Sequence, residues 1–248
     1  MKRKCWEWNE FQQIGTDYAS LDEVAAYDSR MRMMRDVDAE NREILKLLHL
    51  PANGSVLEIG TGTGAFLRAA AKVCGNCVGL DVSPVMLEYA ERRAREENLS
   101  NIRFEYGGFL SGAYPENAFD GVVSGLALHH LPDLWKALAL RRIHSVLKPG
   151  GRFVLLDVVF DWKSDSPEAY FDRLVKDRDS SRENFIRHIA QEYSTLDWIM
   201  KGLFEHAGFV LESESVKMDF LRLYCVRKGG TAPQRFGAGS LNSREKPG

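Results

Sequence analysis

The sequence has few cysteines and no long hydrophobic run. Four cysteines in 248 residues are too sparse for the disulfide frameworks that stabilise small secreted proteins. No apolar stretch approaches the roughly 20 residues that a membrane-spanning helix needs. The basic start of the chain is not followed by the apolar segment of a secretory signal. We therefore expect a cytoplasmic protein with no membrane span.

The sequence also lacks an excess of either charge. Its 33 basic and 35 acidic residues give a net charge of −2. Because proteins that bind nucleic acid usually carry a basic surplus or stripe, we expect no nucleic-acid partner. Cys74 and Cys77 have C-x-x-C spacing, but no second pair and no histidines lie near enough in sequence to complete a zinc site. We expect ordinary thiols at these positions and no bound metal.

Short apolar runs that alternate with helical patterns predict one α/β domain. A chain of this length with 44% hydrophobic residues can bury one sizeable core. Strands that alternate with helices are typical of a parallel sheet, and the last two strands predict a hairpin. We expect a doubly wound sheet with helices on both faces and seven strands, mostly parallel with an antiparallel closing hairpin. The strands are predicted at 56–59, 77–81, 101–106, 119–124, 152–160, 209–217 and 220–227.

The helical patterns fill the intervals between these strands. Residues 21–50 are helical in pattern up to a stop at Pro51-Ala52-Asn53-Gly54. A strong turn is expected at 148–151, and residues 161–195 are polar and mostly helical, without an obvious strand. Further helices are predicted at 65–73, 83–98, 133–147 and 196–206.

The most informative segment is Val56-Leu57-Glu58-Ile59-Gly60-Thr61-Gly62-Thr63-Gly64. Its apolar start and alternate glycines predict a buried strand that breaks into a tight loop, whose backbone passes close to a ligand. An alanine-rich helical segment follows, so the loop lies at a helix N-terminus. The next apolar run ends in Asp81. Strand, glycine loop, helix, strand and acid are typical of a nucleoside-cofactor site.

The glycine loop alone fits two cofactors. Gly60, Gly62 and Ala65 satisfy the dinucleotide pattern G-x-G-x-x-G/A, and Asp81 has the spacing of a ribose-binding acid. The same residues fit the E-x-G-x-G-x-G loop of methyltransferases that use S-adenosylmethionine (SAM). Residues further along the chain are needed to choose between them.

Two downstream motifs favour SAM. They are Leu128-His129-His130-Leu131-Pro132-Asp133 and Val146-Leu147-Lys148-Pro149-Gly150-Gly151-Arg152, preceded by Asp120 with Val122-Val123. With the glycine loop they make the chain resemble class I SAM-dependent methyltransferases, which have a Rossmann-like fold. More narrowly, residues 20–227 are similar to the small-molecule group that includes ubiquinone and menaquinone C-methyltransferases, and Ala26-Tyr27-Asp28 resembles that group's N-terminal helix signature. A dehydrogenase would not be expected to combine these motifs.

The resemblance implies roles for residues along the strand ends. Backbone N–H groups of Gly60–Gly64 suit the methionine carboxylate. Glu58 either steadies the loop or meets the methionine amino group. Asp81 accepts both ribose hydroxyls, or else only caps the next helix. The expected cofactor-binding residues are Glu58, Gly60, Thr61, Gly62, Gly64, Asp81, Val82, Met86, Gly108, Phe109 and Ser124.

One position departs from the family pattern. The family usually has Gly-Asp after the third strand, and this Asp reaches the adenine amino group. Here the pair is Gly107-Gly108, followed by Phe109. We therefore expect backbone groups and apolar packing to hold adenine.

The acceptor side is less defined by the sequence. His129 and His130 lie just past the fourth strand, where one can act as a base or orienting group; alternatively, both only brace the loop and cap the following helix. Asp157 and Tyr193 are candidates for the acceptor pocket. Tyr18 and Tyr27 are candidates for a lid over the cofactor.

The favoured function is SAM-dependent, in-line methyl transfer to a small molecule. The alternative is a SAM-binding regulatory protein without turnover. Ser124-Gly125-Leu126-Ala127 replaces the N/D-P-P-Y/F motif of enzymes that methylate nucleobase or glutamine amino groups. We expect a monomer or homodimer, composed of a helical lid segment (1–50), a SAM-binding domain (51–227) with a helical insertion (161–195), and a disordered tail (228–248).

Overall fold

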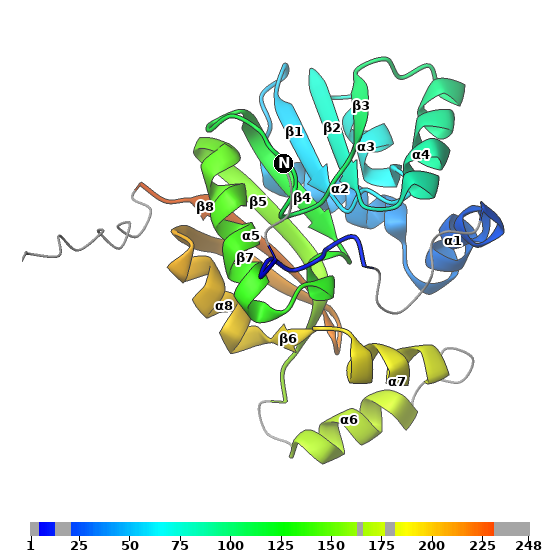
Figure 1. Cartoon of the computed structure of the whole chain (residues 1–248), viewed down its shortest axis with the longest axis vertical. Coiled ribbons are helices and arrows are strands. Elements are labelled where there is room, and N and C mark those ends of the chain that lie inside the picture. The colour runs from blue at the N-terminus through cyan, green and yellow to red at the C-terminus, as the bar shows by residue number, and fades with distance from the viewer. Residues whose placement is uncertain (1–4, 13–20, 163–165, 177–181, 231–248) are drawn as a thin grey trace, which may run out of the picture.

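The computed structural model describes residues 5–12, 21–162, 166–176 and 182–230 (Figure 1). Its sheet has the strand order β3-β2-β1-β4-β5-β8-β7, and a short strand, β6, pairs with β5. Strands β3, β2, β1, β4 and β5 are parallel, while β8 is antiparallel to β5 and forms a hairpin with β7. The strands are β1 (Ser55–Ile59), β2 (Asn76–Asp81), β3 (Ile102–Tyr106), β4 (Phe119–Gly125), β5 (Leu147–Phe160), β6 (Thr195–Leu196), β7 (Phe209–Met218) and β8 (Leu221–Lys228).

The helices surround this sheet, which confirms the doubly wound architecture and the closing hairpin. They are α1 (Leu21–Met34), α2 (Val37–Leu48), α3 (Ala65–Ala70), α4 (Pro84–Glu96), α5 (Asp133–Val146), α6 (Pro167–Lys176), α7 (Arg182–Gln191) and α8 (Asp197–His206), with a 3-10 turn at Leu128–His130. No helix among the described residues has the length and apolar character needed to cross a membrane.

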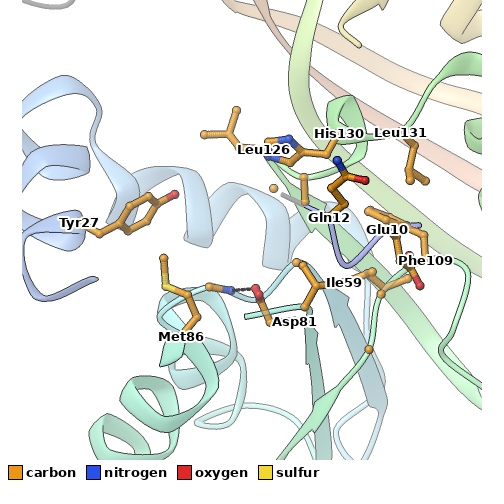
Figure 2. Close-up of a pocket in the computed structure, with 17 residues that line it drawn as sticks. Glu10, Gln12, Tyr27, Ile59, Asp81, Met86, Phe109, Leu126, His130 and Leu131 are labelled. Carbon is orange, nitrogen blue, oxygen red and sulfur yellow. Dashed lines mark hydrogen bonds between the residues drawn. The ribbon is translucent and has the colours of Figure 1, made fainter. Parts of the chain in front are cut away.

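The carboxyl ends of β1, β2, β4 and β5 meet at one edge of the sheet, and the described part of the N-terminal segment, residues 5–12, runs across this edge (Figures 1 and 2). Aromatic contacts hold the segment there. Trp8 packs edge-on against Tyr193, with ring centroids 5.5 Å apart, and Phe11 stacks on Tyr106 at 5.0 Å. The segment therefore covers the edge where ligands bind in open α/β sheets.

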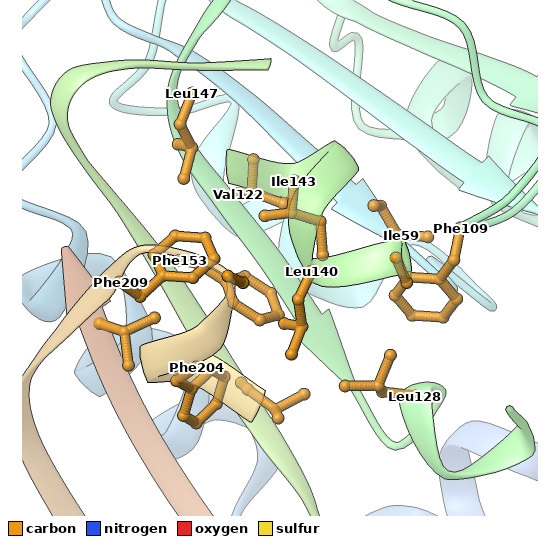
Figure 3. Close-up of a cluster of buried hydrophobic side chains, with 14 of the residues drawn as sticks. Ile59, Phe109, Val122, Leu128, Leu140, Ile143, Leu147, Phe153, Phe204 and Phe209 are labelled. Carbon is orange, nitrogen blue, oxygen red and sulfur yellow. The ribbon is translucent and has the colours of Figure 1, made fainter. Parts of the chain in front are cut away.

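The core lies on both faces of the sheet because strand side chains alternate in direction. Leu57 of β1 belongs to the cluster under α5 and α8, whereas its neighbour Val56 belongs to the cluster under α2, α3, α6 and α7. Figure 3 shows the first cluster, in which Leu140 and Ile143 of α5 meet Phe153 of β5. This two-sided packing fixes the positions of the strand ends.

Local signals explain where several elements begin. The Ser83 side chain accepts a hydrogen bond from the Met86 N–H at 3.3 Å, and Pro84 occupies the first turn of α4, where its missing N–H costs nothing. The expected helix over residues 21–50 is two helices, because Asp36 ends the first stretch and caps α2 through a 2.9 Å bond from the Ala39 N–H. The sequence pattern located the helical region but missed this break.

Two expectations about β5 and the insertion were wrong. The turn expected at 148–151 is an irregularity inside β5, since Phe119 pairs with Leu147 and Gly121 with Arg152. Gly150 accommodates it with φ of +76°. The insertion contains a strand, β6, whose Thr195 pairs with Val159. Two residues carry too little pattern to be recognised as a strand.

Candidate active site

The glycine loop that follows β1 has the backbone conformation its glycines suggested. Gly60, Gly62 and Gly64 have φ values of +78°, +52° and +72°, a region that other L-residues rarely adopt. A Cβ atom on Gly60 would lie 2.3 Å from the Cβ of Ala127. The loop thus needs glycine at position 60 for conformation and for close packing against the segment after β4.

Several N–H groups of this loop are engaged within the protein. Those of Gly60 and Thr61 donate to the Leu80 carbonyl at 2.8 and 2.9 Å, and that of Gly62 donates to Asp81 Oδ2 at 2.8 Å. The expectation that these donors await the methionine carboxylate is not supported by these contacts. Binding of the methionine carboxylate by this loop stays a prediction.

Asp81 is the last residue of β2 and accepts hydrogen bonds from the glycine loop and from the start of α4. Its Oδ1 accepts the Ser83 N–H at 2.8 Å, and its Oδ2 accepts the Gly62 N–H. Burial raises the pKa of Asp81, and these backbone donors only partly oppose that effect. A buried carboxylate without a cationic partner retains lone pairs for further donors such as hydroxyl groups.

Glu58 is a loop-bracing acid in this structure. The Thr61 hydroxyl donates to Glu58 Oε2 at 2.6 Å. Burial raises the pKa of Glu58 to about 8, against the lowering effect of the Thr61 bond. Both residues line a second pocket of about 740 Å³ including its open mouth, which shares Tyr27, Gly60 and Gly62 with the main one.

The main pocket lies over the strand ends and measures about 870 Å³ including its open mouth. In Figure 2, Asp81 and Ile59 form its floor, Tyr27 and Met86 lie on one side, and Glu10, Gln12 and Phe109 lie on the other. The sequence-predicted residues that line it are Tyr27, Gly60, Gly62, Asp81, Val82, Met86, Gly108, Phe109 and His130.

Several predicted site residues lie outside the main pocket. Gly64 is the N-cap residue of α3, and the buried Ser124 hydroxyl donates to the Ile59 carbonyl at 2.9 Å. Tyr193 is held by its own backbone, which donates to the His129 carbonyl at 2.9 Å, and by the edge contact with Trp8. Tyr18 lies outside the described residues.

The sequence reasoning missed two pocket residues on the N-terminal segment, Glu10 and Gln12. Glu10 Oε2 accepts the Leu110 N–H at 2.9 Å, and Oε1 accepts the Ser111 N–H at 2.6 Å. These partners are about one hundred residues away in the chain. The only sequence signal was indirect: the carboxylate expected at position 108 is missing.

His129 and Asp157 form a buried cluster with the end of α7 instead of facing the main pocket. His129 Nδ1 lies 2.5 Å from Asp157 Oδ1, and His129 Nε2 lies 3.1 Å from Glu192 Oε2. Glu192 also meets His188 Nδ1 at 2.7 Å. His130 is beside the cluster and lines the pocket, with its Nδ1 buried and lacking a hydrogen-bond partner among the described residues.

The two carboxylates set the charges of the paired histidines. Burial lowers the pKa of His129, but Asp157 and Glu192 outweigh this effect and raise that pKa to about 9. Burial and the positive His129 together lower the pKa of His130 to about 4. At neutral pH the cluster therefore contains a protonated His129 beside a neutral His130.

His129, His130 and Glu192 also place three ligand-type atoms within 4.8 Å of one another, a spacing that a metal ion could use. The proton on His129 already balances negative charge in this cluster, since its two nitrogens face Asp157 and Glu192. The absence of a metal stays a prediction.

Raising the pH from 7 to 10 should destabilise the protein as His129 loses its proton. The folded pKa of about 9 exceeds the ordinary 6.5, so this stabilisation is complete below about pH 6.5 and is lost as the pH rises through 9. The loss should be on the order of 3 kcal/mol. The melting temperatures of the wild type and of His129→Gln should converge as the pH rises. A difference in melting temperature that stays constant with pH would contradict a raised pKa for His129. The titration of Glu58 does not disturb the comparison, because it affects both proteins alike.

Comparisons with known proteins find methyltransferases. Residues 56–151 match the family model described as a methyltransferase domain. The chain is 25% identical over 237 residues to a demethylmenaquinone methyltransferase of Listeria monocytogenes, covering 92% of each protein. It is 34% identical over 136 residues, 53% of each protein, to the uncharacterised methyltransferase YcgJ of Bacillus subtilis.

Solved structures share the fold at lower identity. The YcgJ crystal structure superimposes with a TM-score of 0.63 at 19% identity, covering 78% of this chain and 100% of YcgJ. A SAM-dependent methyltransferase from Aquifex aeolicus has a TM-score of 0.62 at 18% identity, covering 84% and 98% of the two chains.

The fold, the glycine loop and the acid after β2 match what is expected of the class of SAM-dependent methyltransferases with a Rossmann-like sheet. Residues 56–151 match the methyltransferase-domain model, and the chain is similar to the demethylmenaquinone methyltransferases over most of its length. The dinucleotide alternative is thereby set aside.

Proposed function

We propose that this protein transfers the methyl group of SAM in line to a small-molecule acceptor. The observation that carries the proposal is that one pocket contains both the cofactor-type residues Gly60 and Asp81 and the histidine His130. Adenosine fits the main pocket, and the methionine end extends over Gly60 and Gly62 toward the second pocket, which shares that loop. SAM supplies a methyl carbon already activated by its sulfonium.

The residues of the chain then have mostly positioning roles, as an in-line transfer requires. Asp81 has lone pairs for the ribose hydroxyls, and Val82 and Met86 provide apolar walls for adenine. Gly60, packed against Ala127, fixes the distance between the cofactor loop and the segment that carries His130. His130, neutral at physiological pH, can accept a proton from an acceptor that must lose one.

The acceptor side is bounded by the N-terminal segment and by the region that follows β5. Trp8 of the N-terminal segment packs on Tyr193. Glu192 faces His129 Nε2 at 3.1 Å, and the His188 ring packs edge-on against the His129 ring, with centroids 4.9 Å apart. We include two segments in this proposal. Residues 1–50 form a lid, and residues 161–195 form an insertion that shapes the acceptor pocket. The second pocket includes Tyr27 of α1, which supports the lid role of this helix.

The function is tested by measuring S-adenosylhomocysteine release against a panel of small molecules. Because the Listeria relatives are named demethylmenaquinone methyltransferases, reduced naphthoquinones belong at the front of the panel. Release that depends on one acceptor supports the proposal. Calorimetric SAM binding without release from any metabolite or extract would instead favour the non-catalytic, SAM-binding alternative.

Replacing Asp81 with alanine should weaken SAM binding by tenfold or more, because charge-assisted hydrogen bonds to the ribose are lost, each worth roughly 1.5–3 kcal/mol. Isothermal calorimetry measures the effect. Asp120→Asn is the control, since Asp120 accepts from Ser55 and Lys148 at the start of β1 and of β5, away from the pocket. Equal affinities for Asp81→Ala and the wild type would mean that the ribose lies elsewhere.

A further inference from the structure

The strongest unassigned feature is a carboxylate that the N-terminal segment inserts into the cofactor pocket. Glu10 lines the main pocket beside Gly108 and Phe109 (Figure 2). Its two oxygens are held by the N–H groups of Leu110 and Ser111, at 2.9 and 2.6 Å. This two-point contact fixes the carboxylate against the turn that follows β3.

The position of Glu10 coincides with the place where a side chain is missing. A Cβ atom on Gly108 would lie 2.5 Å from Glu10 Oε2 and 3.1 Å from a methyl carbon of Val82. Gly108 does not have a positive φ, so the backbone conformation does not demand glycine there. The absence of a side chain instead leaves room for Glu10.

The carboxylate retains capacity for another donor. An ionised carboxylate has about four acceptor sites, and the two loop N–H groups use two of them. Asp81 and Glu10 are the acidic residues that line the main pocket in the described part of the chain. Asp81 lies at the end of β2, whereas Glu10 lies beside the wall formed by Phe109 and Gly108.

We propose that Glu10 accepts a hydrogen bond from the exocyclic amino group of the cofactor's adenine, so that the N-terminal segment supplies from outside the sheet the acid that position 108 lacks. The inference rests on the proposed placement of adenosine in the main pocket. With Asp81 on the ribose side, a purine between Met86 and Phe109 directs its polar edge toward the loop after β3. An amine donor there meets an anionic acceptor, and the N-terminal segment becomes part of the cofactor site.

The test compares two ligands that differ only in that amino group: S-adenosylhomocysteine and its 6-deamino analogue, in which purine replaces adenine. Wild-type protein should bind S-adenosylhomocysteine roughly tenfold or more tightly than the analogue, as expected for a hydrogen bond to a charged group. In Glu10→Ala this preference should fall to about threefold or less. Calorimetry provides the readout, so no acceptor or turnover is needed.

Two variants separate recognition from loop support. Asp81→Asn should weaken both ligands by the same factor, because the ribose is common to them. The double variant Glu10→Ala/Gly108→Asp should restore the preference by placing a carboxylate on the adjacent position. If Glu10 only supports the loop, its removal will weaken both ligands equally and leave the preference unchanged, which overturns the inference.

The failure of this inference is distinguishable from that of the proposed function. Tight binding of S-adenosylhomocysteine with an unchanged preference in Glu10→Ala rejects the role of Glu10 alone. Absence of binding by the folded wild type rejects the cofactor placement and, with it, both proposals. A wild type that binds both ligands equally also rejects the inference, because no group then reads the amino nitrogen.

Discussion

Replacing Asp157 with alanine should lower the free energy of unfolding by about 3–5 kcal/mol, the range for a buried ion pair that loses one partner. Asp157 Oδ2 accepts the backbone N–H of His129 at 3.0 Å, and Oδ1 faces both His129 Nδ1 and the Val158 N–H at 2.5 and 2.8 Å. The substitution leaves a protonated imidazole and two backbone donors buried without these acceptors. At roughly 2–4 °C per kcal/mol, the melting temperature should fall by about 6–20 °C.

Denaturant and thermal unfolding measure this effect, with Asp172→Ala as the matched control. Asp172 is an exposed carboxylate on α6, so its removal should change stability by less than about 0.5 kcal/mol. Asp157→Asn should fall between the two, because an amide oxygen in the place of Oδ1 can still accept from His129 Nδ1 and the Val158 N–H. If Asp157→Ala loses no more unfolding free energy than the control, the contacts of Asp157 with His129 do not stabilise the fold.

Replacing His130 with alanine should lower kcat about 10²–10⁴-fold, the usual contribution of a general base. His130 lines the pocket, and its pKa of about 4 keeps the ring neutral and able to accept a proton at physiological pH. Binding of SAM should change little, since the ring lies beside Leu126 and Leu131, across the pocket from Asp81 (Figure 2). The reduced rate should therefore appear in kcat more than in the cofactor's KM.

The measurement is release of S-adenosylhomocysteine at saturating SAM and saturating acceptor, using the acceptor found in the screen. His206→Ala is the control, because His206 is exposed at the end of α8. In the wild type, activity that depends on neutral His130 should be lost as the pH falls through about 4. If kcat of His130→Ala is within about threefold of the wild-type value, His130 is not a general base and only lines the pocket.

The parts of the site predictable from the sequence are those with a local signal. The loop at Gly60–Gly64, the acid Asp81 and the helix start at Ser83-Pro84 each follow from neighbouring residues, because backbone conformation and capping act over a few positions. A parallel sheet could also be predicted from the sequence, since parallel strands joined by helices have few allowed connections. The bulge at Gly150 was missed because a glycine pair indicates a turn equally well.

The motif at His129 and His130 could not be resolved from the sequence, which makes both histidines equal candidates for a base. In the structure His129 is buried between two carboxylates, whereas His130 lines the pocket. This division depends on Glu192, which follows α7 and lies close to the place where Thr195 of β6 pairs with Val159 of β5. No spacing in the sequence between residues 129 and 192 encodes that approach.

The sequence by itself therefore determined the class of sheet, the loop that approaches the cofactor and the acid beside it, because these depend on short-range conformational preferences and hydrophobic periodicity. The tertiary structure alone decided that Glu10 fills the space over Gly108 and that Asp157 and Glu192 each face one ring nitrogen of His129. Contacts between such distant segments arise from packing and from the cost of burying charges without partners, and that cost is defined only once the chain is folded.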